Sequence, residues 1–465
     1  MLLTTNRLLT SLFVLLLAGA ALFSMERVLF ADASFILFRI INSDSLQIQE
    51  HRFGSFITQG VPLLAARLQL PLETIVVLYS TSFTLFYLLV VLLLLYRFKE
   101  QELAVLMGLY FLLFVSETWF WMNNEVHQGI AWMFLFFAVI RWLGRKNSHW
   151  IISYPVFIIL AILTLFTHPL ILFPASYLWL FYCSREDWPY TRSSTVLFSC
   201  ILLLIAAVKL YMSTSDSSSY DAEKLQSIRH ISWQNIVEAF HSPLVKELPK
   251  QMLLNYWLVP VLFITGVLAA WKQNARLLMA LTVSYIGLYF LALCMTFRDF
   301  LPFYTESELM PATIFLAVPF VYCALPQMTA RKQVLILAVI ILVRLGYIAS
   351  ASQKWTDRKE WLMQTLETMR RQHTTKGIMY ETETNKKLLL LNWGTPCESI
   401  IASALKGDKP QLTFVVDKPG NTMNRLPLNN EYMIASFEVL HYSFLNRRYF
   451  QLDTTSGYQK LRVAP

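Results

Sequence analysis

The chain has 465 residues, of which 56% are hydrophobic and only 15% are charged. A soluble domain carries about 25% charged residues, so this composition excludes an ordinary soluble protein. The net charge of +9 does not indicate nucleic-acid binding, because most Lys and Arg residues lie beside apolar runs, where they set membrane topology and meet anionic lipid. A soluble basic patch is the alternative interpretation of the charge.

Long apolar runs recur along the chain to about residue 350. A helix needs roughly 20 mostly apolar residues to cross a hydrocarbon core of ~30 Å. Every backbone amide in hydrocarbon must be bonded internally, so such runs form helices. We predict about eleven spans, near residues 7–24, 74–96, 102–120, 125–143, 150–167, 169–183, 194–212, 252–270, 276–296, 309–325 and 332–349. The first run could also be a signal peptide, but its length favours a retained helix.

The loops between these runs differ in charge. The short loops near residues 119–124 and 168 carry no Lys or Arg, and the loop at 297–307 carries only Arg298. The opposite side receives Arg7, Arg97, Lys99, Arg141, Arg145, Lys146, Arg185, Arg192, Lys272, Arg276, Arg331 and Lys332. The positive-inside rule makes that side cytoplasmic. We therefore expect a multi-pass protein of the bacterial inner (plasma) membrane, with a cytoplasmic N-terminus and an extracytoplasmic C-terminus.

The first outer loop, residues 25–73, contains apolar residues at helical spacing. Residues 33–41 and 53–68 fit short amphipathic helices in the membrane interface. Pro62 lies inside the second segment and predicts a kink or a later helix start. The sequence thus predicts a mainly α fold, with a transmembrane helical bundle over residues 1–350.

Residues 351–465 are predicted to form a small soluble extracytoplasmic α/β domain. Apolar faces at helical spacing and short apolar runs give its elements. We expect helices at 357–371 and 396–405, and strands at 388–391, 412–416, 432–437 and 448–452.

The best catalytic candidates are acidic groups near the outer membrane surface, where a carboxylate is costly to bury. Asp32 follows the first span and could act as a general base with a raised pKa; it could also simply end the span. Asp44 and Glu50 follow on the same loop. His51 and Arg52 could hold a phosphate, or Arg52 could pair with Glu50 at the surface.

A second group surrounds the outer hairpin at residues 118–124. Glu117 and Glu125 flank the hairpin, and His127 lies two residues farther on. This cluster fits a substrate or metal pocket at the mouth of a bundle. The alternative is that these polar residues cap two helices at the water interface.

Two further outer turns carry candidates. His168 at a helix end fits a structural role better than a substrate-binding role. Arg298 could neutralise an anionic headgroup or pyrophosphate, or pair with Asp299. Lys209 and Arg344 lie toward outer helix ends, where long side chains can reach the interface.

Several motifs of known enzyme classes are absent from the sequence. No GxxxxGK[ST], GxSxG or HExxH motif occurs. The five cysteines form no CxxC pair, so their spacing does not indicate a zinc site. Most spans have no central Asp or Glu, which argues against a proton-coupled pump.

The layout resembles the GT-C superfamily of membrane glycosyltransferases over roughly the whole chain. The shared features are a cytoplasmic N-terminus, about eleven spans, a long first outer loop with amphipathic helices and an early Asp, and a soluble outer domain. The resemblance implies that Asp32 acts as the base or positions the acceptor, with Asp44 or Glu50 as substitutes. It also implies a polyprenyl-phosphate-linked sugar donor, whose phosphate Arg52 and Arg298 would hold. The superfamily usually has two adjacent acids, whereas Ala33 follows Asp32 here.

The implied reaction is inverting or retaining transfer of a sugar to a lipid, glycan or protein acceptor on the outer face. Cations or a divalent metal ion would stabilise the departing phosphate. The alternatives are a polysaccharide ligase or polymerase, a lipid or solute transporter, and a non-enzymatic subunit of envelope assembly.

Overall fold

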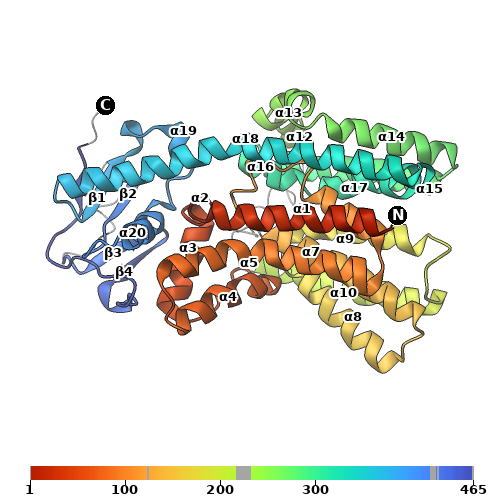
Figure 1. Ribbon diagram of the computed structural model, residues 1–465, viewed down its shortest axis with the longest axis horizontal. Coiled ribbons are helices and arrows are strands. Elements are labelled where there is room, and N and C mark those ends of the chain that lie inside the picture. Colours follow the sequence, from red (N-terminus) through yellow and green to blue (C-terminus); the bar gives the residue numbers. More distant parts are fainter. Residues whose placement is uncertain are drawn as a thin grey trace.

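The computed structural model describes residues 2–122, 125–215, 222, 232–418, 421, 426 and 429–462. A long helical bundle leads into a smaller C-terminal part that contains the strands (Figure 1). The prediction of a mainly α fold with a small α/β part is confirmed.

Within the described residues, six helices are long and apolar enough to cross a membrane, which indicates a membrane-embedded protein. They are α1 (Leu2–Leu22), α5 (Leu72–Leu92) with its continuation η2 (Leu93–Phe98), α7 (Glu125–Arg145), α10 (Arg192–Ser215), α15 (Arg276–Thr296) and α18 (Ala330–Arg371). The number rises to eight if each of two bent pairs is one span. These pairs are α13 (Pro243–Leu254) with α14 (Leu258–Lys272), bent by 82°, and α16 (Pro302–Leu309) with α17 (Ala312–Pro319), η4 (Phe320–Ala324) and η5 (Leu325–Gln327), bent by 51°.

The predicted number of about eleven spans is not confirmed. Three of the predicted spans are helices shorter than the roughly 20 residues that a span requires. They are α6 (Gln101–Tyr110), α8 (Trp150–Leu165) and α9 (Leu172–Cys183), with 10, 16 and 12 residues.

The early end of α6 is explained by polar side chains that satisfy the backbone after it. Arg344 donates from Nε to the carbonyl of Leu112 at 2.9 Å and from Nη2 to that of Val115 at 2.8 Å. Glu306 accepts from the amide of Ser116 at 2.9 Å. Irregular backbone is tolerated at membrane depth when protein groups bond it. Arg344 is only 1% exposed, so the prediction that it reaches the interface is wrong.

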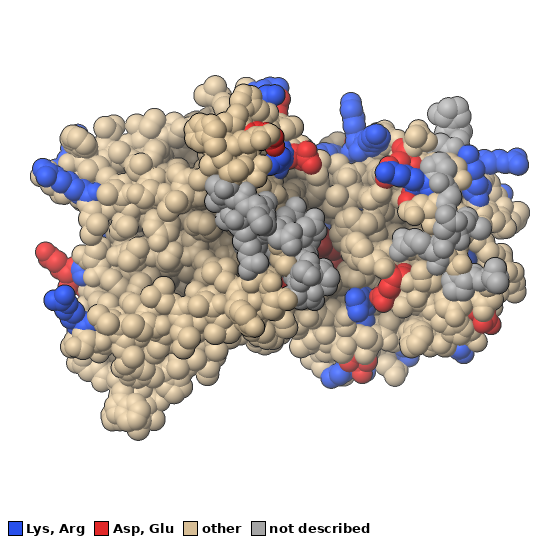
Figure 2. Space-filling view, turned by 180° about the vertical axis from the view of Figure 1, so that it is seen from behind, with Lys and Arg blue, Asp and Glu red and all other residues tan. Residues whose placement is uncertain are grey.

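The two ends of the bundle carry different parts of the chain. The first turn of α1 and the C-terminal strands lie at opposite ends of the long axis (Figure 1). Three predicted cytoplasmic loops meet through Arg141, which lies 3.2 Å from Glu100 and 3.1 Å from Asp187. Charged side chains gather toward both ends of the face shown in Figure 2, with a broad uncharged surface between them. This surface fits contact with lipid.

The segment predicted as the first outer loop folds into α2 (Ser24–Val28), α3 (Ala31–Ser43), η1 (Phe53–Ser55) and α4 (Phe56–Arg67), which contains Pro62. Nine of the 13 residues of α3 are buried. The helix packs against both α4 and the C-terminal helix α20 (Thr395–Leu405). Because protein covers it on two sides, α3 is an internal element rather than the interfacial helix predicted from its sequence.

The C-terminal part contains a three-stranded parallel sheet. β1 (Lys376–Tyr380) pairs with β2 (Thr413–Asp417), with Ile378 opposite Val415, and with β5 (Gln459–Lys460), in the order β2-β1-β5. β3 (Tyr432–Ala435) and β4 (Glu438–His441) form an antiparallel hairpin. The shorter described elements are η3 (Pro169–Ile171), α12 (Trp233–Phe240), η6 (Glu381–Glu383), α19 (Lys386–Leu389) and η7 (Tyr442–Phe444).

Several predictions in this part are confirmed and others are wrong. The predicted helix at 396–405 and the strands at 412–416 and 432–437 correspond to α20, β2 and β3. The segment 388–391 ends α19 instead of forming a strand, and 448–452 makes only an isolated bridge at Leu452. The helix predicted at 357–371 is the C-terminal part of α18, so the predicted boundary at residue 350 lies inside one continuous helix.

Candidate functional site

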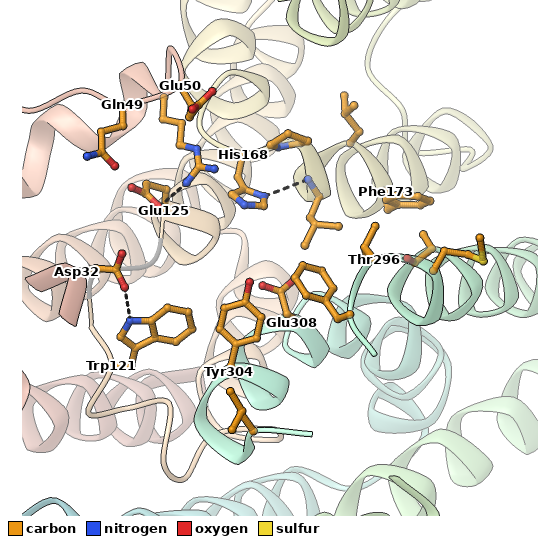
Figure 3. Close-up of a pocket in the computed structure, with 18 of the residues that line it drawn as sticks. Asp32, Gln49, Glu50, Trp121, Glu125, His168, Phe173, Thr296, Tyr304 and Glu308 are labelled. Carbon is orange, nitrogen blue, oxygen red and sulfur yellow. Dashed lines mark hydrogen bonds and ion pairs between the residues drawn. The ribbon is translucent and has the colours of Figure 1, made fainter. Parts of the chain in front are cut away.

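A cavity of about 1390 Å³ lies where the bundle meets the C-terminal part (Figure 3). Its walls come from the start of α3, the segment before η1, the start of α7, η3 and α9, the end of α15, and α16. The C-terminal part contributes Leu391, Trp393 and Phe437. Elements from most of the chain therefore meet at this one place.

The cavity brings together seven of the eleven site residues predicted from the sequence. These are Asp32, Glu50, Arg52, Glu125, His168, Arg298 and Asp299. They come from five separate segments of the chain.

Asp32 is the second residue of α3 and faces the cavity (Figure 3). Its Oδ2 accepts a hydrogen bond from Nε1 of Trp121 at 2.9 Å. Burial raises the pKa of Asp32 to about 6, and the charge of Glu125 acts in the same direction, while the bond from Trp121 and the charge of Arg52 oppose the rise. A carboxylate with this pKa is ionised near neutral pH and can accept a proton.

Arg52 and Glu125 form the charged part of the wall. Nη1 of Arg52 lies 2.9 Å from Oε2 of Glu125, and their side chains are only 10% and 14% exposed. Lys209 is fully buried and donates to the carbonyl of Glu50 at 2.9 Å, so it does not reach the interface as predicted. The backbone at Glu50 and His51 has positive φ values of 49° and 56°.

His168 and Arg298 lie farther along the wall. The Nδ1 atom of His168 accepts from the amide of Leu170 at 3.2 Å, which caps η3 as the structural interpretation predicted. Arg298 lies 3.4 Å from Glu238 of α12, and both side chains are about half exposed. The side chain of Arg298 therefore pairs with Glu238 of another helix rather than with its neighbour Asp299.

Two predicted site residues from the first outer loop do not line the cavity. Asp44 is exposed, and its Oδ1 accepts from Nε of Arg67 at 2.8 Å. His51 packs its ring against Phe53, with centroids 6.2 Å apart. Because Asp44 ends α3 whereas Asp32 begins it, the helix carries Asp44 away from the cavity.

The predicted grouping of Glu117, Glu125 and His127 is also wrong. Only Glu125 lines the cavity, while Glu117 pairs with Lys354 of α18 at 2.6 Å. His127 is buried, and its Nδ1 shares a hydrogen bond of 2.8 Å with the hydroxyl of Tyr110. Residues two apart on a helix point about 200° away from each other, so Glu125 and His127 face opposite sides of α7.

Aromatic side chains that were not predicted from the sequence form another part of the wall. Trp393 and Phe437 stack with centroids 5.0 Å apart and an angle of 29° between their planes. Phe35 meets both rings edge-on, with centroids 6.1 and 5.6 Å away. Phe35 lies three residues after Asp32 and so shares its helix face. That spacing was the one available signal, because the partners of Phe35 lie more than 350 residues away.

Another part of the wall is apolar. It is formed mainly by residues from η3, α9 and α15. These residues are Leu170, Leu172, Phe173, Leu288, Ala292 and Met295. Leu288 is 55% exposed on a helix that is long enough to span a membrane. Charged and apolar residues therefore line the same cavity, which fits an amphipathic ligand.

A metal ion was an open expectation for this site. Among the residues that the structure describes, no group of three or more His, Cys, Asp or Glu side chains could hold one. Two of the carboxylates that line the cavity have other partners: Asp32 accepts from Trp121, and Glu125 pairs with Arg52.

Comparison with known proteins does not assign the chain to a family. No protein-family model, no curated protein and no solved structure matches it.

Proposed function

We propose that this protein is an integral-membrane glycosyltransferase of GT-C type in the bacterial inner membrane. It would move a sugar from a polyprenyl-phosphate-linked donor to a lipid, glycan or protein acceptor on the extracytoplasmic face. One observation carries the proposal: Asp32, Arg52 and Glu125 line the same large cavity as an apolar wall that belongs to helices of the bundle.

The amphipathic lining supports a lipid-linked donor. Such a donor has an apolar chain, an anionic phosphate and a polar sugar in sequence. The apolar residues of α9 and α15 fit the chain, Arg52 and Arg298 supply positive charge for the phosphate, and Asp32 and Glu125 line the same cavity. A donor of this kind enters from the bilayer and needs no nucleotide site.

Asp32 is the proposed general base. Its carboxylate takes the proton of the acceptor hydroxyl, and the hydroxyl oxygen attacks the anomeric carbon of the donor sugar. The bond from that carbon to the phosphate oxygen breaks, and polyprenyl phosphate leaves with its electron pair. Arg52 stabilises the developing phosphate charge. We also propose that a divalent cation binds with the donor, which is tested by measuring the transfer rate after addition of a chelator.

The stacked rings of Trp393 and Phe437 are the proposed acceptor surface. Both rings contact Phe35, which follows Asp32 by one helical turn, and Phe437 is 68% exposed. Exposed aromatic faces beside a polar site suit the apolar face of a sugar ring. A glycan or glycolipid acceptor is therefore favoured over a protein.

A transfer assay separates this function from its alternatives. Purified protein in liposomes receives a radiolabelled polyprenyl-phosphate sugar and an envelope extract as acceptor source. Asp32→Asn should lower the transfer rate by about 10²- to 10⁴-fold, the usual contribution of a general base, while the exposed Asp44→Asn serves as the control. If the protein is a transporter or an assembly subunit, the two variants should give equal transfer rates. If it is a ligase or polymerase, Asp32→Asn should lower the rate to the same extent, but the donor or the product should be a polymer.

A further inference from the structure

The turn before Asp32 is held by two charged side chains from distant parts of the chain. Oε1 of Glu398 in α20 accepts a hydrogen bond from the amide of Ala31 at 2.7 Å. Arg358 of α18 donates from Nη2 to Oε2 of Glu398 at 2.5 Å and from Nη1 to the carbonyl of Leu29 at 2.7 Å. Together they bind the backbone on both sides of Phe30.

This pair is completely enclosed. Arg358 is 2% exposed and Glu398 is 0% exposed. The guanidinium carbon of Arg358 also lies 4.5 Å from the centre of the Phe30 ring. A buried ion pair costs desolvation energy and is weak evidence for stability, so a role in specifying one local geometry is a reasonable hypothesis.

The backbone at this point is strained and closely packed. Ala31 has φ of +41°, a region that residues with a Cβ rarely adopt. A Cβ on Gly394 would lie 2.6 Å from the Cα of Ala31 and 2.7 Å from Oε1 of Glu398. Such strain persists only where the surroundings over-determine the conformation, and it is concentrated at functional sites.

We propose that Glu398, held by Arg358, is a positioning residue for Asp32. The amide that Glu398 binds belongs to the residue directly before Asp32, so it sets the direction in which α3 begins. That direction determines whether Asp32 reaches Nε1 of Trp121 and the cavity. Arg358 of α18 and Glu398 of α20 do not line the cavity. They affect its shape through the backbone of residues 29–31, which they bind. The inference rests on the proposed function only where it concerns the rate of transfer.

Paired substitutions test the inference without leaving a buried charge. Replacement of a buried ion pair by apolar residues of similar size is often tolerated by the fold. Arg358→Met with Glu398→Met removes both backbone contacts, whereas Arg358→Met with Glu398→Gln keeps an uncharged acceptor for the amide of Ala31. The matched control is Arg370→Met with Asp408→Met, an ion pair of 2.7 Å in the same part of the chain.

The first readout does not depend on activity. The indole N–H signal of Trp121 is recorded by NMR on the full-length protein in detergent, assigned with Trp121→Phe, and followed against pH. The Met/Met variant should shift this signal and change its titration, the Met/Gln variant should restore both, and the control pair should leave both as in the wild type. The inference would be overturned if the Met/Met variant kept the wild-type signal and titration. It would also be overturned if the Met/Gln variant showed the same altered signal as the Met/Met variant.

The second readout is the rate of sugar transfer. The Met/Met variant should lower kcat by about 100-fold, the cost of misplacing a reacting group by roughly 1 Å, with the KM for the donor unchanged. Loss of donor binding instead would also contradict a positioning role. If Asp32→Asn retains full activity, the proposed function fails, but the Trp121 signal still decides whether Glu398 positions Asp32.

Discussion

Arg52 and Glu125 form an ion pair with 2.9 Å between Nη1 and Oε2 on the wall of the cavity. The pair joins the first outer loop to the first turn of α7, two segments separated by 73 positions in the sequence. Because both side chains are largely buried, a phosphate that enters the cavity finds a cation already oriented by a carboxylate. In the proposed mechanism, the donor phosphate would share Arg52 with Glu125.

Arg52→Ala is expected to weaken donor binding. Hydrogen bonds to charged groups contribute about 1.5–3 kcal/mol, so the KM for the polyprenyl-phosphate sugar should rise by about 10- to 100-fold. Arg67→Ala is the control, because Arg67 pairs with Asp44 at an exposed position outside the cavity. Equal KM values for the two variants would exclude Arg52 from the phosphate site.

The transfer rate should depend on pH through Asp32. Burial raises the pKa of this group to about 6, and a general base acts only when it is deprotonated. The value of kcat/KM should therefore be level above about pH 6 and fall about tenfold for each pH unit below it. A rate that stays level down to about pH 4, near the ordinary pKa of Asp, contradicts this assignment.

Phe437→Ala should weaken acceptor binding without affecting the fold. An aromatic contact contributes about 0.5–1.5 kcal/mol, which predicts a KM for the acceptor about 2- to 10-fold higher. Phe444→Ala is a close control, since Phe444 is 69% exposed, compared with 68% for Phe437, and does not line the cavity. The acceptor surface is wrongly placed if both variants bind the acceptor equally well.

Arg344→Met should destabilise the bundle itself. The substitution leaves the carbonyls of Leu112 and Val115 without their donor, and each unsatisfied buried group costs about 1–3 kcal/mol. The unfolding temperature in detergent should fall clearly, while Arg331→Met, at an exposed position near the start of the same helix, should leave it unchanged. An unfolding temperature equal to that of the wild type would show that the backbone after α6 does not depend on Arg344.

The sequence predicted the apolar helices well because hydropathy is a local property. The structure does not confirm all of the predicted spans, since the end of α6 depends on Arg344 and Glu306, which lie about 200 residues farther along the chain. The strand β1 was missed for a similar reason. Lys376 and Gly377 do not resemble strand residues, and pairing with β2 and β5 decides their conformation.

The candidate site was predicted in part. Asp32, Arg52, Glu125 and His168 could be selected because charged or polar residues at outer turns stand out from an apolar background. Their actual partners could not be selected, because the contacts of Glu125 with Arg52 and of Asp32 with Trp121 depend on tertiary packing. The same holds for Glu398, which reads as an ordinary first-turn acid of a helix in the sequence.

Cysteine labelling at position 32 tests the central claim most directly. In a variant without its five natural cysteines, Asp32→Cys is exposed to a membrane-impermeant maleimide in sealed, right-side-out vesicles. We predict labelling from the outside, which a polyprenyl-phosphate sugar slows and a nucleotide sugar does not. Labelling only from the cytoplasmic side, or labelling that the lipid-linked sugar does not slow, would contradict an extracytoplasmic donor site at Asp32.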